Sequence, residues 1–134
     1  MPTHLWPALV TLVALLLYLA LGINVGRARV KSGVQAPATS GDPILERAFR
    51  VHYNTLEWLP LFLVSLWIFA LYWNDRIAAL AGAVWIVGRI LYATGYMKDP
   101  AKRGPGFGIQ AFATLFLLLG GLGRVIYLLA ALGG

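Results

Sequence analysis

The fold of this chain is decided by residues 46–60, which read ERAFRVHYNTLEWLP. At 100° per residue, the polar side chains of this stretch fall within an arc of roughly 80° on one helix face. They are Arg47, Arg50, Asn54 and Glu57. The segment that carries them is otherwise apolar enough to cross a membrane, where charged side chains are costly. The stripe must therefore face a partner helix or a water-filled pocket, and we expect it to hold an anionic or zwitterionic ligand.

The composition indicates an integral membrane protein. The 134 residues are 60% hydrophobic and only 12% charged, which is about half the charged fraction of a typical soluble protein. A net charge of +6 suits nucleic acid or a membrane as a partner. Because the basic residues lie beside apolar segments, we expect membrane lipids and no nucleic acid. The absence of cysteine and the presence of only two histidines exclude disulfides and predict no metal site.

Four apolar segments are long enough to cross a hydrocarbon core of ~30 Å. They span about residues 5–25, 47–73, 77–97 and 107–132. Strand-like alternation is absent, and only helices or closed barrels satisfy the backbone in lipid. We therefore predict an all-α protein with a single four-helix transmembrane domain over residues 1–134. The first segment has no basic n-region, so we expect an uncleaved helix rather than a signal peptide.

Basic residues are concentrated in two of the three connections. The first connection begins with Arg27, Arg29 and Lys31, and the third contains Lys98, Lys102 and Arg103. By the positive-inside rule, both connections are predicted to face the cytoplasm and both termini to lie outside. We expect the location to be a bacterial inner membrane.

A second polar stripe lies on the third helix. Its members, Arg89, Tyr92 and Tyr96, fall within an arc of about 60° and occupy the cytoplasmic half, as the first stripe does. Two stripes at one depth predict a shared pocket. Arg89 is the obvious partner of Glu57, since buried carboxylates are usually paired, so part of the arrangement can be a structural salt bridge. The remaining arginines and tyrosines suit a ligand with carboxylates, which guanidinium groups bind bidentately.

Two further residues of the second helix stand out. Pro60 lies inside the helix and leaves the carbonyl of Leu56 without its donor, so it either widens the pocket floor through a kink or is a tolerated bend. His52 points away from Arg50 by about 200°. It therefore serves another surface, either the lipid interface or a neighbouring subunit.

Arg124 lies in the outer half of the fourth helix. One interpretation is that its long side chain reaches the outer membrane interface. The alternative is a helix interface, because Gly120, Gly121 and Gly123 allow close approach.

Two motifs resemble a known family. Residues 50–57, RVHYNTLE, closed by Pro60, resemble the signature of the MAPEG family, the membrane-associated proteins in eicosanoid and glutathione metabolism. Residues 85–96, WIVGRILYATGY, resemble the third helix of its microsomal glutathione transferase and leukotriene C4 synthase branch. Length, helix number and loop charges agree, so the resemblance covers essentially the whole chain.

The resemblance implies a homotrimer with glutathione, as co-substrate, at each subunit interface. The positions that match the tripeptide contacts of one protomer are Arg50, Asn54, Glu57, Tyr92 and Tyr96. The neighbouring protomer is expected to contribute Arg29 and His52, and Arg103 matches the arginine that activates the thiol. Trp58 departs from the leukotriene C4 synthase pattern, which has tyrosine there, so one hydroxyl contact to the ligand is in doubt.

The expected function is a membrane-embedded, glutathione-dependent transferase that conjugates the thiolate to lipophilic electrophiles in detoxification. Reduction of lipid hydroperoxides is a possible second activity. One alternative is a non-catalytic relative that binds lipid or fatty acid and needs no thiol-activating arginine. Another is a small multidrug exporter, but such proteins carry a membrane glutamate in the first helix, which is uncharged here. The sequence does not name the electrophile.

Overall fold

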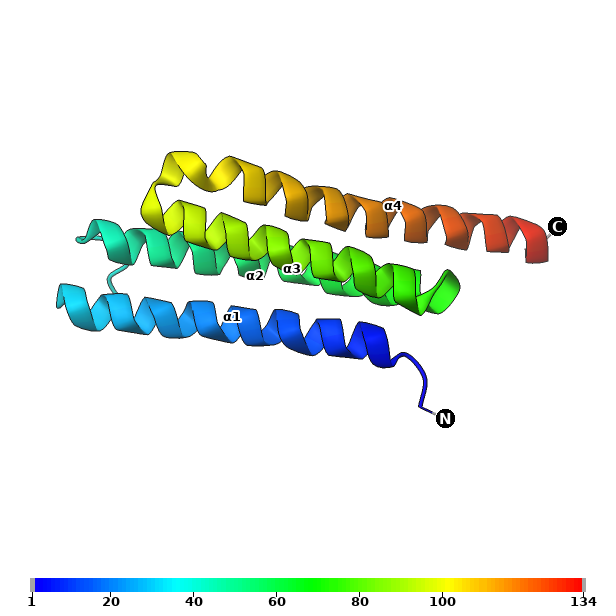
Figure 1. Cartoon of the computed structure of the whole chain (residues 1–134), viewed down its shortest axis with the longest axis horizontal. Coiled ribbons are helices and arrows are strands. Elements are labelled where there is room, and N and C mark those ends of the chain that lie inside the picture. Colours follow the sequence, from blue (N-terminus) through cyan, green and yellow to red (C-terminus); the bar gives the residue numbers. More distant parts are fainter. Residues whose placement is uncertain (1, 134) are drawn as a thin grey trace.

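The computed structural model describes residues 2–133, which form a bundle of long helices (Figure 1). The elements are α1 (Leu5–Ser32), α2 (Pro43–Tyr72), α3 (Asp75–Lys98), the short 3₁₀ helix η1 (Pro100–Arg103) and α4 (Gly104–Gly133). Each of the four long helices is long and apolar enough to cross a membrane. No strand occurs within residues 2–133, so the predicted all-α class is confirmed.

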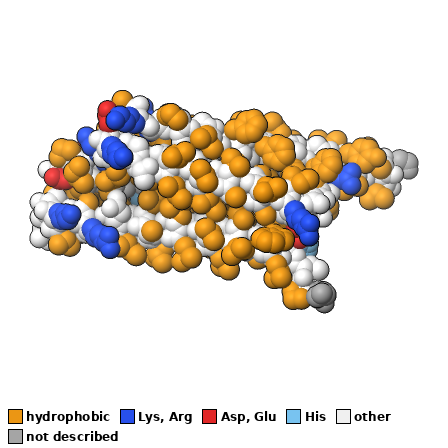
Figure 2. All heavy atoms as spheres, in the orientation of Figure 1, with side chains coloured by type: hydrophobic (Ala, Val, Ile, Leu, Met, Phe, Trp, Pro, Cys, Tyr) orange, Lys and Arg blue, Asp and Glu red, His pale blue; other side chains and the backbone are white. Residues whose placement is uncertain are grey.

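The helices form two central and two outer elements. α2 and α3 lie in the middle, and α1 and α4 each pack against both of them (Figure 1). Loop 33–42 and η1 lie at one end of the bundle, and both chain termini lie at the other (Figure 1). Lysine and arginine side chains gather at the loop end, whereas apolar side chains cover the middle (Figure 2). This distribution is the one that a multi-pass membrane protein shows.

The first helix is longer than the sequence predicted. We expected it to end near residue 25, but α1 continues to Ser32, so Arg27, Arg29 and Lys31 lie on the helix and not in the loop. The apolar pattern marks the part of a helix that lies in lipid, whereas the helix itself ends where its backbone is capped. That cap is Gly33, whose φ of 73° lies in the left-handed region that glycine adopts at low cost.

The other helix ends also have identifiable caps. α2 begins about one turn earlier than predicted because the Asp42 carboxylate accepts a hydrogen bond from the Leu45 amide at 3.0 Å. α3 begins after Asn74, whose side chain accepts from the amides of Arg76 and Ile77. α2 runs through Pro60 without interruption, and the Pro60 side chain is exposed. The predicted widening of the pocket by a kink there stays a prediction.

Arg124 ties the C-terminal end of α2 to α4. Its Nε donates to the Tyr72 carbonyl at 2.9 Å, and its guanidinium lies 4.8 Å from the Trp73 ring. Trp73 Nε1 in turn donates to the Gly120 carbonyl at 2.8 Å. Of the two predicted roles for Arg124, the structure therefore favours the helix interface, because the guanidinium satisfies a carbonyl that the end of α2 leaves free.

A glycine contact sets the distance between α3 and α4. A Cβ atom on Gly106 would overlap the backbone nitrogen of Tyr92 and would lie 2.7 Å from the Gly88 carbonyl oxygen. A Cβ atom on Gly88 would lie 2.7 Å from the backbone nitrogen of Gln110. The two backbones are thus in direct contact, which small residues permit in membrane bundles. This contact fixes the start of α4, and η1 before it, against the half of α3 that carries Tyr92.

We predict that Gly106→Ala lowers the free energy of unfolding by about 1–3 kcal/mol, because the added methyl group forces the two backbones apart. Gly108→Ala is the matched control on the same helix, since a Cβ there meets nothing within 4 Å. The control should match or exceed wild-type stability, because alanine favours helix over glycine. Denaturant unfolding in detergent compares them, and equal stability of the two variants would contradict the close contact.

We also predict that the loop end is cytoplasmic, because the basic residues gather there. The chain has no cysteine, so single cysteines can be introduced at the exposed residues Thr3 and Gln35. A membrane-impermeant maleimide should label Thr3→Cys from outside intact cells and Gln35→Cys only in inverted vesicles. Labelling of both from the same side is incompatible with this topology.

Candidate functional site

A hollow of about 350 Å³ lies between α2, α3 and η1 at the loop end of the bundle. Its lining combines cationic, anionic, amide and phenol groups within one small volume. The lining residues are Arg50, Tyr53, Asn54 and Glu57 from α2, Tyr92 and Tyr96 from α3, and Arg103 from η1. The two polar stripes predicted from the sequence therefore meet in this hollow. Arg47 and Arg89, which belong to those stripes, do not line it. We call this hollow the polar pocket.

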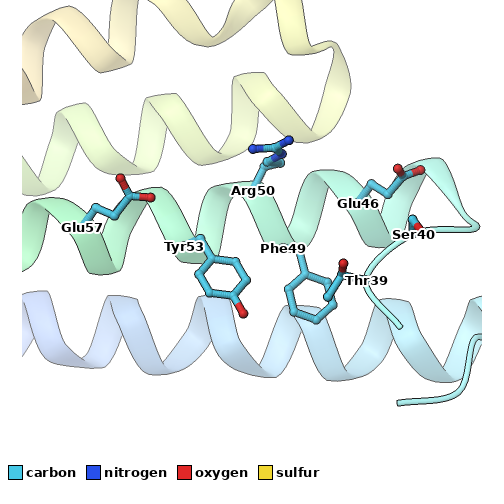
Figure 3. A pocket seen from close by; sticks show the side chains of 7 residues that line it. All are labelled: Thr39, Ser40, Glu46, Phe49, Arg50, Tyr53 and Glu57. Atoms are coloured by element: carbon cyan, nitrogen blue, oxygen red, sulfur yellow. The ribbon is translucent and has the colours of Figure 1, made fainter. Parts of the chain in front are cut away.

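A second hollow of about 400 Å³ adjoins the polar pocket and shares Arg50, Tyr53 and Glu57 with it (Figure 3). Thr39 and Ser40 of loop 33–42 and Glu46 and Phe49 of α2 complete its lining. In Figure 3, Arg50 and Glu57 project away from α1, whereas Phe49 and Tyr53 project toward it. Because they share these residues, the two hollows form one continuous polar trough along α2.

The charged groups that line the polar pocket form no ion pair with one another or with any other residue from 2 to 133. Arg50, Glu57 and Arg103 are exposed, and the single ion pair within residues 2–133 joins His4 to Asp75 at 2.9 Å. The predicted salt bridge between Glu57 and Arg89 is therefore wrong.

The physical reason lies in the direction of the Arg89 side chain. Arg89 turns into the bundle, where it is 0% exposed and its Nη1 donates to Thr55 Oγ1 at 3.4 Å. Glu57 remains on the open face of α2. The pocket carboxylate and guanidinium groups are thus left available to a ligand.

The inner wall of the polar pocket is aromatic. Tyr92 is only 4% exposed, and its ring lies 5.7 Å from Tyr96 and 6.0 Å from Phe107. Beside this wall, the Oδ1 atom of Asn54 is buried and accepts no hydrogen bond within the described chain. Buried acceptors are almost always satisfied, so Asn54 calls for a donor from a ligand or water.

η1 holds Arg103 at the mouth of the polar pocket. The Asp99 carboxylate accepts from the Ala101 amide at 3.0 Å and so starts the turn. Arg103 Nη1 donates to the Pro100 carbonyl at 2.7 Å, and the guanidinium lies 6.0 Å from the Tyr96 ring. The turn packs tightly on α3, because a Cβ on Gly95 would lie 2.7 Å from the Lys102 carbonyl oxygen. The cation is therefore aimed over the aromatic wall.

Arg29 and His52 lie outside the polar pocket of their own chain. Arg29 Nη1 donates to the Ala38 carbonyl at 2.9 Å, and its guanidinium lies 5.3 Å from the Phe49 ring. The His52 ring stacks on Tyr18 of α1 at 4.6 Å. Arg29 of α1 therefore faces loop 33–42 and Phe49 of α2, whereas His52 of α2 faces α1. Their predicted contribution to a neighbour's ligand stays a prediction.

Arg47 and Trp58 are likewise not pocket residues. Arg47 donates to the carbonyls of Met97 and Lys98 at 3.1 and 3.2 Å, so it joins α2 to the end of α3. Trp58 packs edge-on against Phe107 at 5.4 Å.

Sequence reasoning missed Tyr53, although it lies only about 60° from Arg50 on the helical wheel. It also missed Thr39 and Ser40, because a loop without periodicity gives no directional signal. No group of three or more His, Cys, Asp or Glu side chains that could hold a metal occurs within residues 2–133.

The family model described as "MAPEG family" matches residues 7–123, which include parts of all four long helices. The chain belongs to the MAPEG family. It is similar to the uncharacterised protein sll1147 of Synechocystis sp., with 52% identity over 96% of this chain and 93% of the relative. It is 41% identical to human microsomal glutathione S-transferase 2 over 75% of this chain and 69% of that protein. It is 36% identical to guinea-pig (Cavia porcellus) leukotriene C4 synthase over 92% and 83% of the two chains.

Proposed function

We propose that this MAPEG protein is a membrane-embedded glutathione-dependent transferase that conjugates the glutathione thiolate to lipophilic electrophiles. The observation that carries the proposal is the polar pocket, where unpaired cations and an unpaired carboxylate surround a buried amide acceptor without a partner. The two relatives named for a glutathione transferase and for leukotriene C4 synthase support the same reaction class.

The groups of the polar pocket complement those of glutathione. The tripeptide carries two carboxylates, one ammonium group, two amides and a thiol. Arg50 offers a planar pair of donors to a carboxylate, and Glu57 offers an acceptor to the ammonium group. The unpaired Oδ1 of Asn54 can accept from a peptide N–H. Tyr92 and Tyr96 add hydroxyl groups at the inner wall.

A second copy of the chain is expected to cover the open side of the polar pocket. Arg50 and Glu57 are exposed on a helix that can span a membrane, and charged groups there must face protein or water rather than lipid. A homotrimer of the kind that the family resemblance implies would meet this need. Arg29 and His52 of the neighbouring copy are then the expected additional contacts to glutathione.

Arg103 is the proposed activator of the thiol. The thiolate is the nucleophile, and a free thiol has a pKa of about 8.5. Lowering that pKa by two requires about 2.7 kcal/mol of preferential interaction with the charged form, which an aimed guanidinium can supply. The sulfur then forms a bond to the electrophilic carbon, and the displaced group or the opened oxygen leaves with the electron pair. No cysteine of the protein is needed, and the chain has none.

The electrophile is expected to reach the sulfur from the bilayer, where lipophilic compounds concentrate. The same thiolate can attack the O–O bond of a lipid hydroperoxide, which releases the alcohol and leaves a glutathione sulfenic acid that a second glutathione reduces. The non-catalytic alternative requires no cation at the pocket mouth. The position of Arg103 over Tyr96 therefore favours the enzyme.

We predict that Arg50→Ala weakens glutathione binding by about 2–4 kcal/mol, because it leaves a desolvated carboxylate without its partner. Isothermal titration calorimetry of the purified protein gives the affinity. Arg47→Ala is the matched control one helical turn away, since Arg47 bonds to backbone carbonyls of α3 and lies outside the pocket. Equal affinities for wild type and Arg50→Ala, with the assembly intact, would show that the stripe is only structural.

For catalysis, we predict that Arg103→Ala lowers the turnover rate about 10²-fold or more, because one charge aimed at the thiolate is removed. The pH–rate profile should move to higher pH, since the thiol pKa rises toward its free value. The neighbouring Lys102→Ala should retain the wild-type rate, because Lys102 does not line the pocket. A normal rate and an unshifted profile in Arg103→Ala would refute this assignment.

A further inference from the structure

Arg89 is a buried cation to which the proposed reaction has so far assigned no role. It is 0% exposed, and the helical rise places it roughly 14 Å along α3 from Lys98, near the middle of a membrane. Its Nη1 makes one long hydrogen bond to Thr55 at 3.4 Å, whereas Nε and Nη2 have no partner. No carboxylate pairs with it within residues 2–133.

Packing alone does not explain an arginine in this position. A charge at bilayer depth is costly, and unpaired buried donors add to that cost. Replacing buried charged groups by well-packed apolar residues is often neutral or stabilising. Intramembrane ionisable residues are therefore usually functional, and the question is what the charge of Arg89 acts on.

The neighbours of Arg89 lead directly to the polar pocket. Its Cζ lies 4.8 Å from the Tyr92 ring centroid and 5.6 Å from that of Trp85. Tyr92 lines the polar pocket, and Tyr96 and then Arg103 follow it toward the mouth. Arg89, Tyr92, Tyr96 and Arg103 thus form a row with a cation at each end. We call it the cation–tyrosine row.

We infer that Arg89 is a positioning residue that promotes thiolate formation through Tyr92. Its guanidinium holds the Tyr92 ring by a cation–π contact. The same positive charge favours negative charge beyond the ring, so the Tyr92 hydroxyl becomes a better donor to the glutathione sulfur. This inference rests on the proposed function and adds an inner cation, which does not touch the ligand, to Arg103 at the mouth.

The other charged or titratable groups around this region are few. α2 contributes Arg50, Tyr53 and Glu57 to the pocket, and η1 contributes Arg103. The part of α4 packed here presents Phe107 and Gln110, which do not titrate. On the α1 side, Tyr18 stacks on His52 of α2, and residues 19–26 carry no titratable group. A substitution at Arg89 changes none of these residues, so a change in the thiol pKa can be assigned to the loss of the Arg89 charge.

The test measures the ultraviolet absorbance of the thiolate against pH in the purified protein saturated with glutathione. Arg89→Met removes the charge but keeps a long, flexible side chain. We expect the pKa of the bound thiol to rise by about 1, which makes the thiolate fraction about tenfold lower at pH values well below it. At about pH 5.5, where the bound thiol is mostly protonated in both proteins, the dissociation constant should change less than threefold. The midpoint of thermal unfolding should not fall. Arg89→Lys keeps the charge and should restore most of the shift.

The variant Tyr92→Phe, and the double variant that combines it with Arg89→Met, test whether Arg89 acts on the thiol through Tyr92. If Arg89 acts through Tyr92, Tyr92→Phe alone raises the thiol pKa, and adding Arg89→Met raises it little further. Arg124→Met is the matched control, because it removes an arginine contact at the end of α2 that lies far from the pocket. It should lower the unfolding midpoint and leave the thiol pKa unchanged.

An Arg89→Met variant whose bound thiol titrates as in wild type would overturn the inference, as would additive effects of the two substitutions. If Arg89→Met does not fold, an unchanged thiol pKa in Tyr92→Phe overturns it equally. A wild-type protein that binds no glutathione contradicts the proposed function itself. If instead the wild-type protein binds and ionises glutathione and Arg89→Met does so equally well, the proposed function stands and only the role of Arg89 is refuted.

Discussion

The cost of placing charge in a hydrocarbon layer is the constraint on which this structure depends. Three arginines of the long helices meet this constraint in different ways. Arg124 bonds to the carbonyl at the end of α2, and Arg89 is enclosed between aromatic rings. Arg50 has neither a carbonyl nor a carboxylate partner and faces an open pocket with Glu57. The arginine without an internal partner thus marks the site, whereas the bonded arginine holds the bundle together.

The site is built by close contact between the helix backbones. The glycine contact between α3 and α4 brings η1 against the half of α3 that carries Tyr92 and Tyr96. α2 contributes Arg50, Asn54 and Glu57 from one side of a single helix. A small shift of α4 would move Arg103 away from the aromatic wall. The catalytic proposal therefore depends on backbone packing as much as on the charged residues themselves.

Much of this arrangement could be predicted from the sequence, because hydropathy and the helical period report on it directly. The four spans and the meeting of Asn54 with Tyr92 follow from segment length and residue spacing. The end of α1 could not be predicted in this way, because the apolar pattern stops at the lipid boundary while the helix continues to its glycine cap. The direction of Arg89 was also missed. A helical wheel gives an angle, but it does not say whether a long side chain reaches toward Glu57 or into the core.

The central claim is that the pocket binds glutathione as the thiolate. The most direct measurement is a titration of the wild-type protein in lipid nanodiscs with glutathione at pH 7, followed by the ultraviolet absorbance of the thiolate. We expect a saturable thiolate signal that S-methylglutathione, which has no ionisable thiol, displaces. A signal that does not saturate, or a bound thiol that titrates near the free value of about 8.5, would contradict the account.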